Sequence, residues 1–269
     1  MYEEFYGLRA QPFNPTPDPR FLFLSTRHRE ALDHLLFGIR QRKGFILISG
    51  DVGAGKTTLC RAALEQLGGQ AETALILNPM LSGIQLLRAI LHELHLDDRG
   101  NDRLRLNQRL NEYLLERARE SRDVVLFVDE AQDLSPESLE EVRLLSNLET
   151  DDRKLLQIVL LGQPELRETL ERRELRQLRQ RITVVYHLGP LDRAETEAYV
   201  AHRLEVAGAN GRPTFTPAAM RAIHFHSRGV PRLINAICDR TLLAGFVEGR
   251  DVLGFWQVRR AMRELGGNP

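Results

Sequence analysis

The sequence predicts an α/β fold with a five-stranded parallel sheet, followed by a smaller domain made only of helices. Between residues 25 and 190, short apolar runs alternate with segments whose apolar residues recur at helical spacing. The runs are apolar at nearly every position, as is typical of strands buried on both faces of a parallel sheet. After Gly189-Pro190 only helical patterns remain. The predicted strands are residues 45–49, 73–77, 124–128, 156–161 and 183–188.

Helical patterns fill the intervals between the strands and the region after them. A helix begins near Ser25-Thr26, and the next are predicted at residues 59–67, 84–94, 104–118 and 139–148. Later helices start at a capping box formed by Asp192 and Glu195, at Thr216-Pro217, near Pro231 and near Val252. We therefore predict an N-terminal arm (residues 1–24), an α/β domain (25–190) and a helical domain (191–269). Prolines at 12, 15, 17 and 19 predict an extended arm from Leu8 to Pro19.

The composition excludes several classes of protein. Lys+Arg and Asp+Glu number 37 each, so the net charge is zero and gives no general attraction to nucleic acid or membranes. The two cysteines, Cys60 and Cys238, have no metal-binding spacing. The N-terminus lacks the apolar core of a signal peptide, and no apolar run reaches the ~18 residues of a membrane span. We expect a cytosolic protein, or one held at a membrane by a partner.

A complete GxxxxGK[ST] motif follows the first predicted strand and precedes a predicted helix. Its glycines let successive backbone N–H groups turn toward phosphates, and the helix N-terminus adds its positive dipole end. Lys56 supplies an ammonium group for the β- and γ-phosphates, and Thr57 supplies a hydroxyl for Mg²⁺. The predicted site for ATP and Mg²⁺ comprises Gly50, Asp51, Val52, Gly53, Ala54, Gly55, Lys56, Thr57 and Thr58.

Two carboxylates follow the third predicted strand. Asp129 and Glu130 come directly after a buried apolar run, at the strand end where ligands bind in open α/β sheets. Asp129 is suited to hold Mg²⁺ through water, and Glu130 to polarise the attacking water as a base. The alternative is that these residues only cap the next helix. Together with the phosphate loop they predict hydrolysis of ATP.

Three polar positions complete the predicted site. Gln163, after the fourth strand, can reach the γ-phosphate or the attacking water, although a simple turn residue is the alternative. Before the fifth strand lies an arginine-rich segment in which Arg181 is the first choice for a group acting on a neighbouring subunit, ahead of Arg179 and Arg176. A solvated basic surface is the alternative there.

Arg232 lies in the first turn of a predicted helix, where the helix dipole disfavours a cation. A nearby phosphate explains an arginine at this position better than packing does. We therefore predict that Arg232 senses the nucleotide, with an ordinary surface arginine as the alternative.

These motifs resemble an AAA+ ATPase, and the nearest resemblance is to the ExeA/GspA-type secretion ATPases, including those encoded beside exosortase and exopolysaccharide genes. The resemblance rests on the phosphate loop, VDEAQ at 128–132, LLGQPEL at 160–166, GVPR at 229–232, and the opening YEEFYGLRAQPFNPTPDPRFLF. HREAL at 28–32, SNL at 146–148 and QRI around Arg181 agree with it.

The resemblance implies a five-stranded core, a helical lid, and assembly into a ring or dimer through bound nucleotide. It implies that Gln163 is sensor 1, Arg181 the arginine finger and Arg232 sensor 2, with residues 21–24 and the lid near Leu233 flanking the adenine. Two departures are visible: sensor 1 is more often Asn, Ser or Thr in this family, and ExeA-like proteins continue into a membrane span and a periplasmic peptidoglycan-binding region. The chain ends at Pro269, as expected of the exosortase-associated form or of part of a longer protein.

Three functions remain open from the sequence. The first is an ATPase that powers or regulates assembly of an envelope export system, working with an inner-membrane component. The second is a DNA-associated ATPase resembling transposition regulators, favoured by the arginines between 167 and 181 and disfavoured by the zero net charge. The third, a small-molecule phosphotransferase, lacks an acceptor site. The sequence leaves open the cargo, the oligomer number and which arginine acts in trans.

Overall fold

The computed structural model of the protein describes residues 1–14, 18–150 and 153–266. Pro15 and Pro17, two of the prolines behind the predicted extended arm, lie outside this part of the chain. The chain divides into two compact units, each described by itself below. One contains Met1–Arg27, Gly53–Thr58 and Gly189–Pro269, and the other contains His28–Val52 and Leu59–Leu188.

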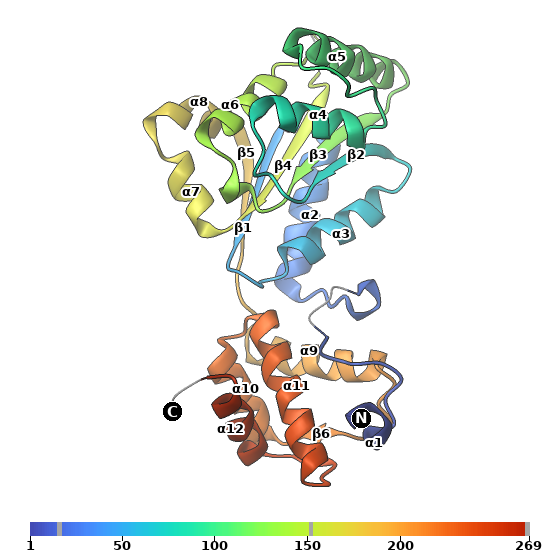
Figure 1. Ribbon diagram of the computed structural model, residues 1–269, viewed down its shortest axis with the longest axis vertical. Coiled ribbons are helices and arrows are strands. Elements are labelled where there is room, and N and C mark those ends of the chain that lie inside the picture. The colour runs from blue at the N-terminus through green and yellow to red at the C-terminus, as the bar shows by residue number, and fades with distance from the viewer. Residues whose placement is uncertain (15–17, 151–152, 267–269) are drawn as a thin grey trace. The chain divides into compact units, whose positions relative to one another are not determined.

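The second of these units is built on the predicted parallel sheet (Figure 1). Its five strands lie in the order β2-β3-β4-β1-β5, and every neighbouring pair is parallel. The strands are β1 (Phe45–Gly50), β2 (Ala71–Ile76), β3 (Asp123–Val128), β4 (Leu156–Gly162) and β5 (Ile182–Leu188). All residues of β1 and β4 are buried, which confirms that the central strands are covered on both faces.

Helices cover this sheet and connect its strands. They are α2 (Thr26–Arg40), α3 (Lys56–Leu67), α4 (Gly83–Glu93), α5 (Arg103–Arg119), α6 (Pro136–Leu145), α7 (Pro164–Leu170) and α8 (Arg176–Arg181), with 3₁₀ turns η2 (Ala131–Asp133) and η3 (Arg173–Leu175). Leucines of α4, α5 and α6 form one core with alternate residues of β1, β3 and β4. On the other face α2 approaches β1 closely, since a Cβ at Gly38 would lie 2.7 Å from Cδ1 of Ile46.

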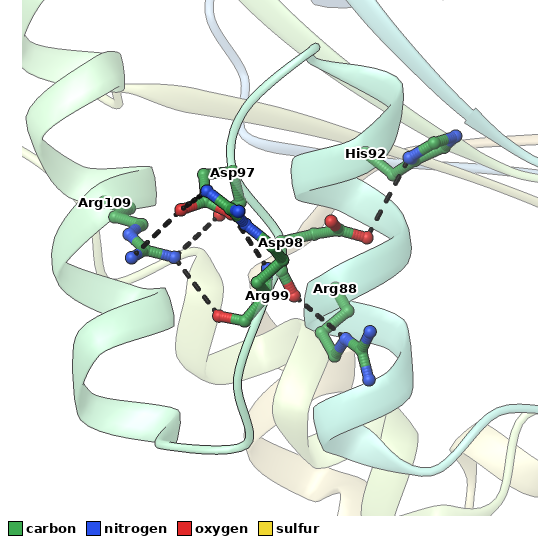
Figure 2. A network of polar contacts seen from close by, with 6 residues as sticks. All are labelled: Arg88, His92, Asp97, Asp98, Arg99 and Arg109. Carbon is green, nitrogen blue, oxygen red and sulfur yellow. Dashed lines mark hydrogen bonds and ion pairs between the residues drawn. The ribbon is translucent and has the colours of Figure 1, made fainter.

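The connection between α4 and α5 is held by its own ion pairs and backbone contacts (Figure 2). Nε of Arg99 donates to Oδ1 of Asp97 at 2.8 Å, and Arg109 donates to the carbonyl of Asp97 at 2.9 Å. Arg88 on α4 donates to the carbonyl of Asp98 at 3.0 Å. Hydrogen bonds from Arg99 lower the pKa of the Asp97 carboxyl to about 2. The bond from the Arg99 side chain has the largest effect, followed by the bond from its backbone N–H. The loop is therefore tied to both flanking helices.

The other unit is mainly helical, as predicted, with one addition. Its helices are α9 (Arg193–Val206), α10 (Pro217–Ser227), α11 (Pro231–Val247) and α12 (Phe255–Glu264). The predicted capping box of Asp192 and Glu195 opens α9. Two short strands, β6 (Thr214–Phe215) and β7 (Val252–Leu253), pair in parallel, so α12 begins at Phe255 and not at Val252. Strands of two residues are too short to produce an alternating pattern in the sequence.

The N-terminal segment packs into the core of this helical unit. It contains a short helix, α1 (Tyr2–Tyr6), and a 3₁₀ turn, η1 (Pro19–Phe21), which the sequence did not predict. Along the predicted extended path from Leu8 to Pro19, the described residues before Pro19 form no helix. Tyr6 and Phe13 are 1% exposed and contact residues of α9, α10 and α11 in one apolar cluster. The Tyr6 hydroxyl donates to the carbonyls of Leu242 and Arg250, both at 3.1 Å. Aromatic anchors therefore hold this segment in the helical unit; the boundaries at 24/25 and 190/191 stay predictions.

Among the helices of the described residues, none combines the length and the apolar character that crossing a bilayer requires.

Gly229 gives a test of the packing in the helical unit. Its φ is +76°, and a Cβ there would lie 1.9 Å from the carbonyl oxygen of Leu191, a backbone atom that no rotamer change can move away. We expect Gly229→Ala to lower the free energy of unfolding by about 2 to 4 kcal/mol, from left-handed strain and overpacking. Gly249→Ala is the control, because Gly249 has φ +65° and open space around it. Urea unfolding of both variants should separate them, and equal losses would contradict the predicted clash.

Candidate active site

The phosphate loop joins the end of β1 to the start of α3. β1 ends at Gly50 and α3 begins at Lys56, so the motif forms the predicted strand–loop–helix. Gly53 has φ +77° and Gly55 has φ +103°, conformations that L side chains rarely adopt. Lys56 is only 6% exposed. A buried ammonium group at a helix N-terminus is suited to meet an anion.

Arg232 lies against this loop. It occupies the first turn of α11, and a Cβ added to Gly53 would lie 2.5 Å from Cβ and 3.3 Å from Cδ of Arg232. Any side chain at position 53 would therefore displace the arginine. Among the described residues the Arg232 guanidinium has no carboxylate partner, and the residue is exposed. The contact places the predicted sensor 2 beside the predicted phosphate loop.

Asp129 and Glu130 follow β3 directly, at the same edge of the sheet as the end of β1. Asp129 is 3% exposed, and its backbone N–H extends the ladder by donating to the carbonyl of Ile76 at 2.9 Å. Glu130 has φ +49°, which is uncommon for a residue other than glycine and typical of strained functional positions. It precedes the turn η2 but makes no capping hydrogen bond with its side chain. The predicted alternative, a simple cap, therefore does not account for Glu130.

Cys60 on α3 is close enough to Asp129 to be affected by its charge. Burial raises the pKa of the Cys60 thiol to about 12, and the negative charge of Asp129 raises it further. Cys60 lies three and four residues after Thr57 and Lys56, and residues at these spacings share one face of a helix.

A third residue, Gln132, joins Glu130 to Gln163. Nε2 of Gln132 donates to Oε2 of Glu130 at 2.9 Å, and Oε1 of Gln132 accepts the backbone N–H of Gln163 at 3.0 Å. Nε2 of Gln163 also donates to Oε2 of Glu130, at 3.4 Å. Gln163 occupies the N-cap position of α7 without a capping hydrogen bond from its side chain. The sequence pattern placed Glu130 and Gln163 correctly at strand ends, but it assigned no role to Gln132.

Arg181 lies at the amino-terminal end of the strands, opposite the end that carries Asp129 and Glu130. It is the last residue of α8 and immediately precedes β5, whose first residue, Ile182, is level with Phe45 at the start of β1. The phosphate loop leaves the far end of β1, at Gly50. Nη1 of Arg181 donates to the buried hydroxyl of Ser146, which in turn donates to the carbonyl of Arg143 at 2.6 Å. The structure brings Arg181 near none of the other predicted site residues of the sheet.

The residues predicted to flank the adenine, 21–24 and Leu233, differ in how far they are buried. Phe21 is buried in the helical unit, with the guanidinium of Arg203 4.9 Å from its ring centroid. Phe23 is half-buried and packs edge-on against Tyr199 at 5.7 Å. Leu233 is 46% exposed. Contact of this segment with adenine stays a prediction, and Phe21 is already committed to the core.

Residues 39–170 match the family model described as AAA domain. The chain carries an AAA domain. It is also 47% identical over 268 residues, 99% of its length, to General secretion pathway protein A of Aeromonas hydrophila. The predicted resemblance to the ExeA/GspA-type ATPases is thereby confirmed. The chain spans about half (49%) of the length of that relative.

Solved structures show the same fold at low sequence identity. The chain resembles the ORC2 protein of Aeropyrum pernix with a TM-score of 0.69 and 17% identity, over 95% of this chain and 71% of that one. The RuvB Holliday junction branch migration motor of Thermotoga maritima matches with a TM-score of 0.62 and 20% identity, over 91% and 73% of the two chains. These similarities support an AAA P-loop fold that comprises the sheet unit and the helical unit.

Proposed function

We propose that this AAA domain binds ATP with Mg²⁺ and hydrolyses it to ADP and phosphate. The observation that carries the proposal is the placement of a phosphate loop and an acidic pair after β1 and β3, two strands of one parallel sheet whose carboxyl ends share an edge. Lys56 would neutralise charge on the phosphates, and Arg232 would sense the nucleotide from α11. Glu130 would accept a proton from the attacking water, with Gln163 beside it.

The donor set suits Mg²⁺ better than a metal held by protein side chains alone. Thr57 and Asp129 supply a hydroxyl and a carboxylate, the oxygen ligands that Mg²⁺ takes together with water and phosphates. Within the described part of the chain, no group of three His, Cys, Asp or Glu side chains is placed to hold a metal ion. When bound, Mg²⁺ would neutralise charge that develops on the phosphate oxygens. Thr57 and Asp129 would hold and orient it.

We further propose that Arg181 serves the nucleotide of a neighbouring copy. Arg181 lies just before Ile182, and Gly50 is level with Leu188, six residues further along β5. At the rise of a strand this separation is roughly 20 Å. An arginine side chain cannot span that distance within one chain. A ring or dimer in which this edge faces the next phosphate loop would complete each site, with Arg179 and Arg176 as the exposed alternatives.

The biological role that we propose is to power or regulate assembly of a bacterial envelope export system. The support is the 47% identity to a protein whose name places it in general secretion. The action would take place at the cytoplasmic face of the inner membrane, through a partner there. Nucleotide-dependent changes in oligomer state would be the output.

One observation favours the second candidate, a DNA-associated ATPase. Five arginines of the segment containing α7 and α8 are exposed, and in the described ranges their side chains have no carboxylate or carbonyl partner. Unpaired arginines on one segment are suited to contact phosphates. They are Arg167, Arg172, Arg173, Arg176 and Arg179.

Glu130→Gln tests the hydrolytic role. The amide keeps the size of the side chain but cannot accept a proton, so we expect ATP binding to be retained and turnover to fall by about 10²-fold or more. Phosphate release and binding of a fluorescent ATP analogue measure the two properties. Lys56→Ala is the companion that should lose binding itself. Normal turnover by Glu130→Gln would show that Glu130 is not the base.

Mixing two inactive variants tests the shared site. Arg181→Ala should keep ATP binding and lose about 10³-fold in turnover, because the transition-state charge is no longer stabilised. A Lys56→Ala subunit cannot bind ATP but still carries Arg181. Mixed oligomers should therefore regain part of the activity, with Arg179→Ala and Arg176→Ala as matched controls. Rescue of one of these two, and not of Arg181→Ala, would move the role to that arginine.

Duplex DNA binding separates the two roles. For the export role we expect weak binding at 50 mM salt that disappears at ~200 mM, since only the local arginine surface contributes. Fluorescence anisotropy of a labelled duplex measures this, with the Arg172→Ala/Arg176→Ala variant as the control. Tight binding that persists at the higher salt would favour the DNA-associated role.

A further inference from the structure

Gln132 links the two groups that the proposed hydrolysis needs beside the reacting phosphate. It is the middle residue of the turn η2, two residues after Glu130. Its side-chain nitrogen donates to Oε2 of Glu130 and its side-chain oxygen accepts from the backbone of Gln163. These bonds connect the loop after β3 to the loop after β4, the neighbouring strand in the sheet.

The direction of the Gln132 amide follows from its partners. A backbone N–H can only donate, so the atom that faces Gln163 N must be the amide oxygen. The amide nitrogen then faces Glu130, whose ionised carboxylate can only accept. Both hydrogen bonds of the side chain are thus satisfied in one orientation, and flipping the amide would break both.

The Gln132 side chain packs closely against Gly162, where the absence of a Cβ leaves room for it. A Cβ at Gly162, the last residue of β4, would lie 3.2 Å from Oε1 of Gln132 and 2.6 Å from Cδ2 of Leu166. A larger residue at 162 would press on the Gln132 amide and on α7 at once. Gln132 is half-buried, so water competes only in part for its two hydrogen bonds.

We propose that Gln132 is a positioning residue that fixes the Glu130 carboxylate for attack by water. Two amides, from Gln132 and Gln163, donate to the same oxygen, Oε2. Within the described residues Oε1 of Glu130 receives no side-chain hydrogen bond, so it is the atom that would take the proton. A carboxylate held in one orientation is preorganised for the transition state. The inference rests on the proposed role of Glu130 as the base.

Gln132→Glu separates positioning from mere support of the loop. The new carboxylate keeps an acceptor for the Gln163 N–H but replaces the donor to Glu130 by a like charge. We expect kcat to fall about 10- to 100-fold, with KM and affinity for a fluorescent ATP analogue changed less than about 2-fold. Gln70→Glu, the same change at an exposed position of the same unit, should leave kcat unaltered.

A double-mutant cycle decides whether the effect passes through Glu130. In the Glu130→Gln background, Gln132→Glu should cause no further loss of single-turnover hydrolysis, because the group that it positions has already been removed. An equal loss in both backgrounds would overturn the proposal, as would wild-type kcat in Gln132→Glu. Normal turnover by Glu130→Gln alone would instead overturn the underlying assignment of the base, so the two failures are distinguishable.

Gln132→Met serves if the acidic variant unfolds below the assay temperature. Methionine has a similar length and no charge, and it removes the donor to Glu130 without adding repulsion. The same fall in kcat, absent in the Glu130→Gln background, is expected. Unchanged kcat in a folded Gln132→Met, checked by thermal melting and nucleotide binding, would refute the positioning role.

Discussion

The alignment of strand ends in the parallel sheet is the constraint on which the site depends. Ser49 is level with Gly162, and Val128 is level with Leu160, so β1, β3 and β4 finish at one edge. A shift of one residue in β3 would turn Asp129 toward the opposite face. The register is held by central strands that are buried on both faces and therefore tolerate no slip. Apolar packing of the buried strands therefore determines where the polar loops at their ends lie.

Much of the sheet unit could be predicted because its signals are local. Apolar runs and helical spacing gave each strand within two residues of its observed ends, and strand-end position placed Asp129, Glu130 and Gln163 at the edge that carries the phosphate loop. Motif spacing was sufficient for the phosphate loop for the same reason: the five residues 51–55 between β1 and α3 adopt a conformation that Gly53 and Gly55 permit. Resemblance added the family, which the AAA match and the GspA relative confirm.

The features that the sequence did not predict depend on three-dimensional neighbours. Gln132 donates to the side chain of Glu130. Glu130 adopts a left-handed conformation, and no residue pattern predicts a positive φ at a glutamate. Ser146 meets Arg181 across a separation of 35 residues. The sequence did not predict that the aromatic residues before Leu8 pack into the helical unit, because the partners of Tyr2 and Tyr6 lie more than 200 residues away, at Asp239 and Leu242. These contacts follow neither a period nor a motif in the sequence.

The burial of Tyr6 between the carbonyls of Leu242 and Arg250 has a consequence for how the chain is made. During synthesis, at about 5 to 20 residues per second, the segment that contains Tyr6 leaves the ribosome long before α11 has been made. Tyr2, Tyr6 and Phe13 therefore lack most of their packing partners, which lie from Leu191 onward, while the sheet unit is translated. This segment emerges before its partners on α11 and can pack against them only after they have been made. Until then its aromatic residues are exposed to chaperones and to neighbouring chains on the same message.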